Sequence, residues 1–266
     1  MTERADVHTV RCGLAASREK AQALIRAGRV VWEGRTVEKP AQPVPDDAVF
    51  DLQGEAEQAY ASRGGYKLEK AVQAFGADVR GAVAMDVGAA AGGFTDVLLR
   101  HGAAHVYAID VGYGQLEARL RADERVTVME RTNARNLTRE QIALQPNLTV
   151  MDVSFISIRL ILPTAARIMG NQGRFLTLVK PQFEAGRGGV GKNGVVRDAA
   201  VHQRVLEEIC AFAPSFGWHV AQLTYSPVKG PAGNVEFLAD IQPGTEGTVT
   251  EKEIMAVTRA AHQALR

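Results

Sequence analysis

The chain has 266 residues, of which 46% are hydrophobic and 23% are charged, and its formal net charge is +1. These values exclude a fibrous, a disordered and a membrane-embedded protein, and the charge balance argues against a wholly basic nucleic-acid binder. The polar N-terminus lacks an apolar secretory segment. Cys12 and Cys210 lie far apart and outside any metal-binding pattern, so we expect free thiols in the cytoplasm and no metal site.

The first predicted domain, residues 1–58, is a small α+β unit. Apolar residues at helical spacing follow Ser17, a favourable N-cap, and the pattern stops at Gly28. This combination predicts a helix between the two. Residues 30–32 and 35–37 flank a Glu-Gly pair and predict a short β-hairpin.

A predicted linker at residues 59–63 leads to the second predicted domain, residues 64–266. There, apolar segments of strand length alternate with segments of helix length. This alternation predicts an α/β fold with a doubly wound, Rossmann-like sheet. The predicted strands are residues 83–87, 105–110, 126–130, 148–152, 174–179, 219–225 and 235–241, and the predicted helices are residues 95–101, 160–169 and 199–212.

Charged side chains end or directly follow four of these strands: Asp110, Glu130, Asp152 and Lys180. In open parallel sheets, ligands bind at the carboxyl ends of the strands. A lysine that closes a buried strand is unusual, because lysine is rarely buried without a partner. Lys180 and Asp152 fit either a structural ion pair or a lysine that orients or deprotonates a sugar hydroxyl, whose own pKa is far above neutral. Their position at strand ends favours the second interpretation.

The first strand runs into a glycine-rich loop, Asp86-Val-Gly88-Ala-Ala-Ala-Gly92-Gly93-Phe94, which opens a helix. Glycines let a ligand approach the backbone, although a generic tight turn has the same composition. Ala90 occupies the second glycine position of the dinucleotide-binding pattern, and the chain has no P-loop. Asp110, 22 residues beyond Gly88, suits the two hydroxyls of a ribose. A ribose without a pyrophosphate matches S-adenosylmethionine.

The predicted contacts of S-adenosylmethionine are Asp86, Gly88, Ala89, Gly92, Gly93, Phe94, Asp110 and Asn133. Asn133 follows the third strand and fits either an adenine contact or an ordinary surface position. Lys67, before the first strand, and Glu236, at the turn into the last one, would each alone indicate a solvated surface charge. Together with Asp152 and Lys180 they form a Lys–Asp–Lys–Glu set, which we predict to be catalytic.

This set and the glycine-rich loop resemble the RrmJ/FtsJ-like class of 2′-O-ribose methyltransferases. The fuller match is to the TlyA group, also labelled haemolysin A, which joins an N-terminal S4 RNA-binding domain to that methyltransferase fold. The resemblance extends from about residue 5 to residue 241. Its motifs include Ser17-Arg-x-x-Ala-x-x-Leu-Ile-x-x-Gly28, Ser62-Arg-Gly-Gly-x-Lys67-Leu, Asp110-Val-Gly-Tyr-Gly-Gln115, Asp152-Val-Ser-Phe-Ile-Ser157, Leu178-Val-Lys-Pro-Gln-Phe-Glu184 and Gly233-Asn-Val-Glu236.

The resemblance implies S-adenosylmethionine-dependent methylation of cytidine 2′-hydroxyls in ribosomal RNA, in the large subunit and, as in longer members, also in the small one. It implies contact with ribosomal RNA or subunits without membrane insertion, and it leaves the oligomeric state open. Residues 11–39 carry seven basic and three acidic side chains, which fits either phosphate docking or an ordinary solvated helix face. The predicted RNA contacts are Arg4, Arg18, Lys20, Lys39, Arg63 and Arg187.

Three other functions are open at this point. A non-catalytic S4 ribosome-binding factor would have no need of the Lys–Asp–Lys–Glu set. An NAD-dependent oxidoreductase is disfavoured by Ala90 and by the lack of a catalytic His or Tyr pattern. The third alternative is a membrane-active toxin, and no membrane segment in the sequence supports it. The chain also departs from its relatives, since residues 89–91 are alanines where a hydroxyl pair is common, and residues 58–61 lack the usual basic residue and tryptophan.

Overall fold

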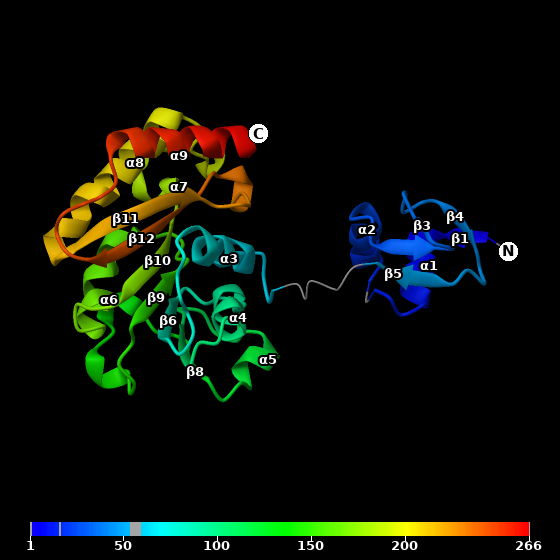
Figure 1. Ribbon diagram of the computed structural model, residues 1–266, viewed down its shortest axis with the longest axis horizontal. Helices are drawn as coiled ribbons and strands as arrows, with labels where there is room; N and C mark the ends of the chain where they lie inside the picture. The colour runs from blue at the N-terminus through cyan, green and yellow to red at the C-terminus, as the bar shows by residue number, and fades with distance from the viewer. Residues whose placement is uncertain (1, 16, 54–59, 266) are drawn as a thin grey trace. The chain divides into compact units, whose positions relative to one another are not determined.

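The fold is taken from a computed structural model, which describes residues 2–15, 17–53 and 60–265 (Figure 1). The chain divides into two compact units, Met1–Ala59 and Tyr60–Arg266. Each unit has its own hydrophobic core.

The N-terminal unit contains short strands and helices around a small core. Its elements are β1 (Thr2–Arg4), α1 (Ala5–Arg11), α2 (Arg18–Arg26), β2 (Val30–Trp32), β3 (Arg35–Thr36), β4 (Pro43–Pro45) and β5 (Phe50–Leu52). Strand β1 pairs with β4, and a second sheet has the order β3-β2-β5. The assignment of this unit to the S4 class stays a prediction.

Two local predictions for this unit are confirmed. The Ser17 hydroxyl accepts a hydrogen bond from the Lys20 amide at 3.3 Å and caps α2. Strands β2 and β3 form the predicted hairpin. Its turn residues Glu33 and Gly34 have φ values of 50° and 74°, the left-handed pair that a type I′ turn requires. Helix α1 was not predicted, because its seven residues contain no long apolar stripe.

The second unit confirms the predicted α/β fold. Its sheet has the order β11-β12-β10-β9-β6-β7-β8, and every predicted strand is present within two residues of its predicted ends. The strands are β6 (Val83–Val87), β7 (His105–Ile109), β8 (Val126–Met129), β9 (Leu148–Met151), β10 (Arg174–Val179), β11 (Trp218–Tyr225) and β12 (Phe237–Pro243).

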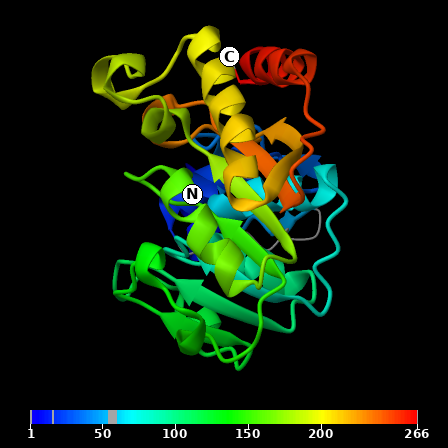
Figure 2. The ribbon, with the colours of Figure 1, turned by 90° about the vertical axis from the view of Figure 1, so that its left-hand side faces the viewer.

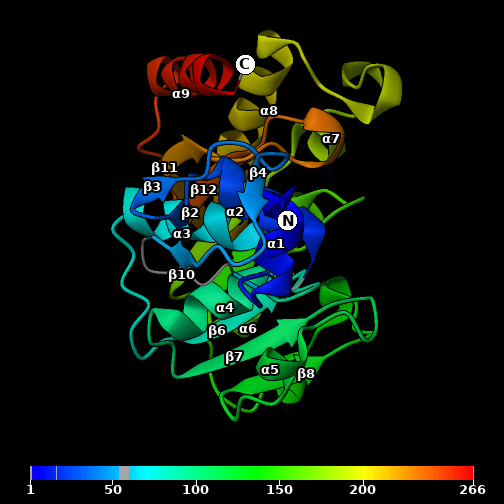
Figure 3. The same ribbon diagram turned by 90° about the vertical axis from the view of Figure 1, so that its right-hand side faces the viewer.

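Helices cover both faces of this sheet, as Figures 2 and 3 show from opposite sides. Alternate residues of a strand face opposite cores: Ala84 of β6 packs with α3 and α4, whereas Met85 packs with α6, α8 and α9. The helices are α3 (Gly64–Ala74), α4 (Gly93–Arg100), α5 (Ala118–Arg121), α6 (Leu162–Ile168), α7 (Pro181–Glu184), α8 (Ala199–Phe212) and α9 (Glu251–Ala264). The 3₁₀ turns are η1 (Ala134–Asn136), η2 (Arg139–Gln141), η3 (Ile158–Leu160), η4 (Arg187–Gly189), η5 (Lys192–Gly194), η6 (Ala213–Phe216) and η7 (Pro231–Gly233). Helix α9 was not predicted. None of the described helices is long and apolar enough to cross a membrane.

The sheet is mixed rather than wholly parallel. Strand β12 runs antiparallel to both of its neighbours, β10 and β11. The connection between β11 and β12 spans residues 226–236, too few for a helical crossover, so a hairpin-like return is the geometry available. As a result, the beginning of β12 lies beside the end of β10, with Phe237 opposite Val179.

Residues 60–63, the described part of the predicted linker, are held by the second unit. The Ala61 amide donates a hydrogen bond to Asp96 Oδ2 at 2.9 Å, and the Tyr60 hydroxyl donates to Glu69 Oε2 at 3.0 Å. The rest of that predicted linker, residue 59, lies outside the described residues.

A histidine pair joins helices α8 and α9 and should make the stability of this unit depend on pH. His202 of α8 is fully buried, and its Nδ1 lies 2.9 Å from His262 Nε2 of α9. Burial, and after it the neighbouring His262, lower the pKa of His202 to about 4. A histidine kept neutral in the folded state destabilises that state as the pH falls below the unfolded pKa.

We therefore expect the free energy of unfolding to fall between about pH 6.5 and pH 4, by up to about 3 kcal/mol from this residue. The His202→Gln variant should lose this part of the decline, since glutamine does not titrate. Urea unfolding at several pH values measures it. Parallel pH curves for the two proteins would contradict the assignment.

Candidate active site

The four predicted catalytic side chains lie together and form one chain of alternating charge. Lys67 Nζ lies 2.6 Å from Glu236 Oε2 and 3.8 Å from Asp152 Oδ2. On the other side of the carboxylate, Lys180 Nζ lies 2.5 Å from Asp152 Oδ1. The order in space is therefore Glu236, Lys67, Asp152 and Lys180, which we call the ion chain.

The topology of the sheet explains how residues so far apart in sequence meet. Asp152 and Lys180 directly follow the parallel strands β9 and β10, so they lie at one edge of the sheet. Glu236 directly precedes β12, and because β12 is antiparallel its beginning lies at that same edge. Helix α3, which packs against β10 and β12, contributes Lys67.

The ion chain is largely removed from water. The exposed fractions of the side chains are 0% for Glu236, 9% for Lys67, 8% for Lys180 and 19% for Asp152. Two positive and two negative groups compensate one another, which buried charges require. Asp152 is the most exposed member, so the ion chain is most accessible to solvent at Asp152, between the two lysines.

Two further side chains complete the hydrogen bonding, and sequence reasoning missed both. Lys180 Nζ donates to Ser154 Oγ at 2.9 Å, and Gln182 Nε2 donates to Glu236 Oε1 at 3.2 Å. Each stands two residues after a member of the predicted set. That spacing was the available signal, since a short turn after a strand brings such a side chain back to the strand end.

A pocket of about 450 Å³ adjoins Asp152. It lies where the sequence predicts the cofactor, and Gly88, Asp110 and Asn133 line it as predicted. The other lining residues are Val87, Ala90, Ile109, Val111, Gln115, Thr132, Ala134, Asp152, Val153, Ser154, Phe155, Ile156 and Ile161. Its size is that of an ordinary small-molecule site. We call it the cofactor pocket.

The glycine-rich loop contacts the backbone of the ion chain. Gly88 has a φ of +87°, and a Cβ there would lie 2.6 Å from the carbonyl oxygen of Asp152. Only glycine fits this combination of a left-handed backbone and a close approach. Ala90 also has a positive φ, 46°, a conformation that costs an alanine about 1 kcal/mol.

Asp110 is held by backbone amides at the mouth of the loop. Its Oδ2 accepts from the Ala90 amide at 2.8 Å, and its Oδ1 accepts from the Gly112 amide at 2.7 Å. A carboxylate oxygen has more than one lone pair, so both oxygens keep acceptor capacity toward the pocket. The strained Ala90 backbone therefore fixes the direction of the carboxylate.

Five predicted cofactor contacts are not among the residues that line this pocket, and their assignment stays a prediction: Asp86, Ala89, Gly92, Gly93 and Phe94. Asp86 is fully buried and accepts a hydrogen bond from Thr95 Oγ1 at 2.6 Å. Burial raises the pKa of Asp86 to about 7, against the opposing effect of the Thr95 hydrogen bond. These residues hold the loop in shape.

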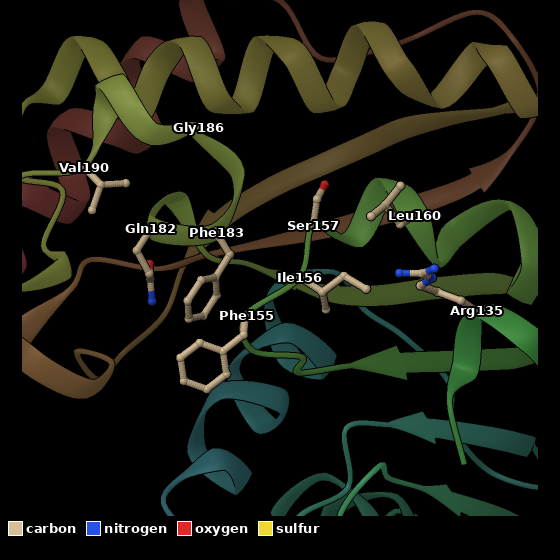
Figure 4. A pocket seen from close by; sticks show the side chains of 9 residues that line it. All are labelled: Arg135, Phe155, Ile156, Ser157, Leu160, Gln182, Phe183, Gly186 and Val190. Carbon is tan, nitrogen blue, oxygen red and sulfur yellow. The ribbon is translucent and has the colours of Figure 1, made fainter. Parts of the chain in front are cut away.

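A second pocket, of about 690 Å³, opens beside the first and shares Phe155 and Ile156 with it. Figure 4 shows the rings of Phe155 and Phe183 close together at one end and Arg135 at the other. The two ring centroids are 5.1 Å apart. Phe155 is 91% exposed and has a φ of +64°. A large apolar side chain is thus presented to solvent by a strained backbone. We call this the aromatic pocket.

Glu184 of α7 anchors the segment that carries Phe155. Its carboxylate is buried and accepts from Ser157 Oγ at 2.5 Å and from the Ile158 amide at 2.8 Å. Arg159 adds an ion pair at 3.4 Å. Burial raises the pKa of Glu184, and the Ser157 hydrogen bond opposes that shift. The carboxylate joins the residues that follow Lys180 to those that follow Asp152.

The predicted RNA contacts fall into three groups. In the N-terminal unit, Arg4 and Arg18 both pair with the buried carboxylate of Asp6 at 3.0 Å, so part of their charge is compensated. Lys20 and Lys39 are exposed, as is Arg63 at the start of α3 in the second unit. The side chain of Arg187 lies outside the described residues.

The family model described as FtsJ-like methyltransferase matches residues 60–241. This chain is an FtsJ-like methyltransferase. It is 44% identical over 262 residues to the 16S/23S rRNA (cytidine-2′-O)-methyltransferase TlyA of Mycobacterium tuberculosis, with 98% of this chain and 97% of that protein covered. It is 42% identical over 228 residues to Hemolysin A of Brachyspira hyodysenteriae, covering 85% and 94% of the two chains.

A solved structure of a Streptococcus thermophilus protein that is named as a hemolysin matches this chain with a TM-score of 0.76 and 42% sequence identity. The alignment covers 99% of the FtsJ-like methyltransferase described here and 96% of that chain. These full-length relatives confirm the resemblance to the TlyA group.

Asp86 gives the methyltransferase a second pH dependence, opposite in sign to that of His202. The folded state keeps the Asp86 proton up to about pH 7, whereas the unfolded chain releases it near pH 4. Stability from this group is therefore lost as the pH rises. The stability of the Asp86→Asn variant relative to the wild type should therefore increase between about pH 4 and pH 7, by up to about 4 kcal/mol in the free energy of unfolding. Denaturant unfolding measures it, and a constant difference across that range would refute the expectation.

Glu184 should position the catalytic loop of the methyltransferase. Glu184→Ala leaves Ser157 and the Ile158 amide without their acceptor, so we expect at least about a tenfold loss of kcat with little change in cofactor affinity. Glu184→Gln keeps an acceptor for the amide and should recover part of the rate. Single-turnover kinetics and calorimetry separate the two effects. Because glutamine fills the same volume as glutamate, equal losses in both variants would show that the charge of the carboxylate, and not an acceptor for the Ile158 amide, is responsible.

Proposed function

We propose that this methyltransferase transfers the methyl group of S-adenosylmethionine to the 2′-hydroxyl of cytidine in 16S and 23S ribosomal RNA. The observation that carries the proposal is the ion chain, which opens at Asp152 beside a pocket with a ribose-binding carboxylate. The full-length relative TlyA of Mycobacterium tuberculosis is named for this activity.

The cofactor pocket suits S-adenosylmethionine. Asp110 offers acceptor capacity to a ribose diol, and Asn133 lies on the same wall for a polar contact with adenine. Ile109, Ala134 and Ile161 supply apolar surface for the purine ring. Gly88 leaves room for a ligand close to the backbone. When bound, the cofactor supplies a methyl group on a positively charged sulfur, which departs as a neutral thioether.

The ion chain prepares the acceptor oxygen. A protonated lysine has three donors, and Lys180 uses two of them on Asp152 and Ser154. The third is available to the 2′-oxygen. Lys180 thereby orients the hydroxyl and stabilises the charge that develops on its oxygen as the hydroxyl proton passes to solvent water. Lys67, fixed by Glu236, holds Asp152 in place, so the catalytic contribution is mainly one of position.

Exposed aromatic and basic groups suit the RNA. Phe155 lies between the cofactor pocket and the aromatic pocket and presents a free ring face on which an unstacked base can rest. A target nucleotide within a helix has to be flipped outward to reach such a site. Lys20, Lys39 and Arg63 are exposed charges for phosphate contacts. We assign the N-terminal unit to RNA docking as an S4-like domain.

The direct test replaces Lys180. Lys180→Ala should lower methyl transfer by at least about 100-fold, because the hydroxyl loses its orienting donor, while cofactor binding persists. The control is Lys70→Ala on α3, whose Nζ lies over the Tyr225 ring at 3.3 Å and outside the ion chain.

Mass spectrometry of both ribosomal RNAs, after incubation of isolated subunits with enzyme and cofactor, locates the modification. Near-wild-type turnover by Lys180→Ala, or methylation of a base instead of a ribose, would overturn the proposal.

A further inference from the structure

Three arginines outside the predicted RNA contacts lie on neighbouring elements of the second unit. They are Arg135 of η1, Arg139 of η2 and Arg167 of α6, and all three are exposed. Thr164 connects two of them: its hydroxyl donates to the Arg135 carbonyl at 3.3 Å and accepts from Arg167 Nη2 at 3.2 Å. Arg139 and Arg167 together line a cavity of about 260 Å³ with Thr138 and Thr164.

Within the described residues, none of these three guanidinium groups forms an ion pair. Arg139 donates to the Ile142 carbonyl and to Gln145 Oε1, both neutral acceptors, and its charge interacts only with that of the adjacent Glu140 within the described residues. The acid of this stretch is Glu140, whose pKa is lowered first by a Thr138 hydrogen bond. One carboxylate against three guanidinium groups leaves the surface positive.

Many other arginines of this unit pair with carboxylates: Arg119 bonds Asp96 at 2.6 Å, Arg125 bonds Asp123 at 2.7 Å and Arg174 bonds Asp240 at 2.7 Å. Among the described residues, Arg63, Arg131, Arg197 and Arg259 also form no ion pair. Arg135, Arg139 and Arg167 differ from these four because Thr164 and a shared cavity bring them together on neighbouring elements. Exposed guanidinium groups that lack a carboxylate partner have donors free for an external anion.

The three arginines continue the active site. Arg135 lines the aromatic pocket, whose other end is formed by Phe155 and Phe183 (Figure 4). Phe155 also lines the cofactor pocket together with Asp152. Shared pocket walls thus lead from the ion chain past Phe155 to Arg135. Thr164 connects Arg135 to Arg167 by hydrogen bonds, and Arg167 shares its cavity with Arg139.

We infer that Arg135, Arg139 and Arg167 form a phosphate-binding track for the ribosomal RNA strand on one side of the target nucleotide. The inference rests on the proposed RNA methylation. Guanidinium groups bind phosphate oxygens in pairs. The end of the aromatic pocket formed by Phe155 and Phe183 suits a base, and the track, which begins at Arg135 at the other end, suits the backbone that follows it.

The test replaces Arg139 and Arg167 together by glutamine, and separately by lysine. The matched control is Arg259→Gln on α9, an exposed arginine of the same unit. Binding of a ribosomal RNA fragment that contains the methylated site is measured from about 50 mM to about 200 mM KCl. Methylation is measured at limiting and at saturating RNA.

We expect the double glutamine variant to reduce the slope of log affinity against log salt by about 1 to 2 and to raise the KM for RNA about tenfold. Its kcat and its affinity for S-adenosylmethionine should stay at the wild-type values. The double lysine variant should restore most of the slope, because it keeps the charge. A salt slope and KM equal to those of the Arg259→Gln control would overturn the track.

The outcomes separate this inference from the proposed function. If the wild type methylates ribosomal RNA and the double glutamine variant behaves like the control, the track is wrong and the function stands. If no RNA is methylated but the variant still loses salt-dependent RNA binding, the track stands and the function is wrong. Loss of binding to an acidic peptide but not to RNA would overturn the track in favour of a protein partner.

Discussion

The structure depends on one electrostatic requirement: four ionised side chains leave water together, so each needs an oppositely charged neighbour. Removing one partner of a buried pair costs about 3–5 kcal/mol, because the other charge is left uncompensated. Glu236, Lys67, Asp152 and Lys180 meet this requirement only if α3, the ends of β9 and β10, and the start of β12 reach one point. Charge compensation and strand order therefore support each other.

The two pockets divide recognition between them through shared walls. The cofactor pocket takes its polar character from a carboxylate that backbone amides hold, so its geometry depends on the loop conformation more than on side-chain choice. The aromatic pocket takes its character from two phenylalanines, one on each of the segments that follow Asp152 and Lys180. Glu184 connects these two segments through its hydrogen bonds with Ser157 and the Ile158 amide. This single buried carboxylate thus fixes the segments that follow Asp152 and Lys180 relative to each other.

Much of this arrangement follows from the sequence, for identifiable reasons. Asp110, Asp152 and Lys180 could be placed at one sheet edge because each directly follows an apolar strand. Lys67 and Glu236 are 169 residues apart, and their meeting could be expected only from the family resemblance. The antiparallel direction of β12, which brings Glu236 to that edge, is not encoded in a periodic pattern. Ser154, Gln182 and Glu184 were missed because an isolated polar residue after a strand has no local signature of burial. The contacts predicted for Asp86 and Phe94 stay predictions, because a loop motif does not distinguish the residues that touch a ligand from those that support them.

The close approach between Gly88 and the Asp152 carbonyl has a consequence for how this enzyme can vary. The loop that shapes the cofactor pocket and the strand end that carries Asp152 meet through backbone atoms, so neither can be remodelled alone. Cofactor affinity and chemical rate share one structural determinant at that point. Substitutions that change cofactor affinity alone should therefore occur at the outer wall of the pocket, where Val111 is 72% exposed and Gln115 also contributes to the lining. Natural sequence variation in this enzyme should accordingly be wide at the rim and narrow at the floor.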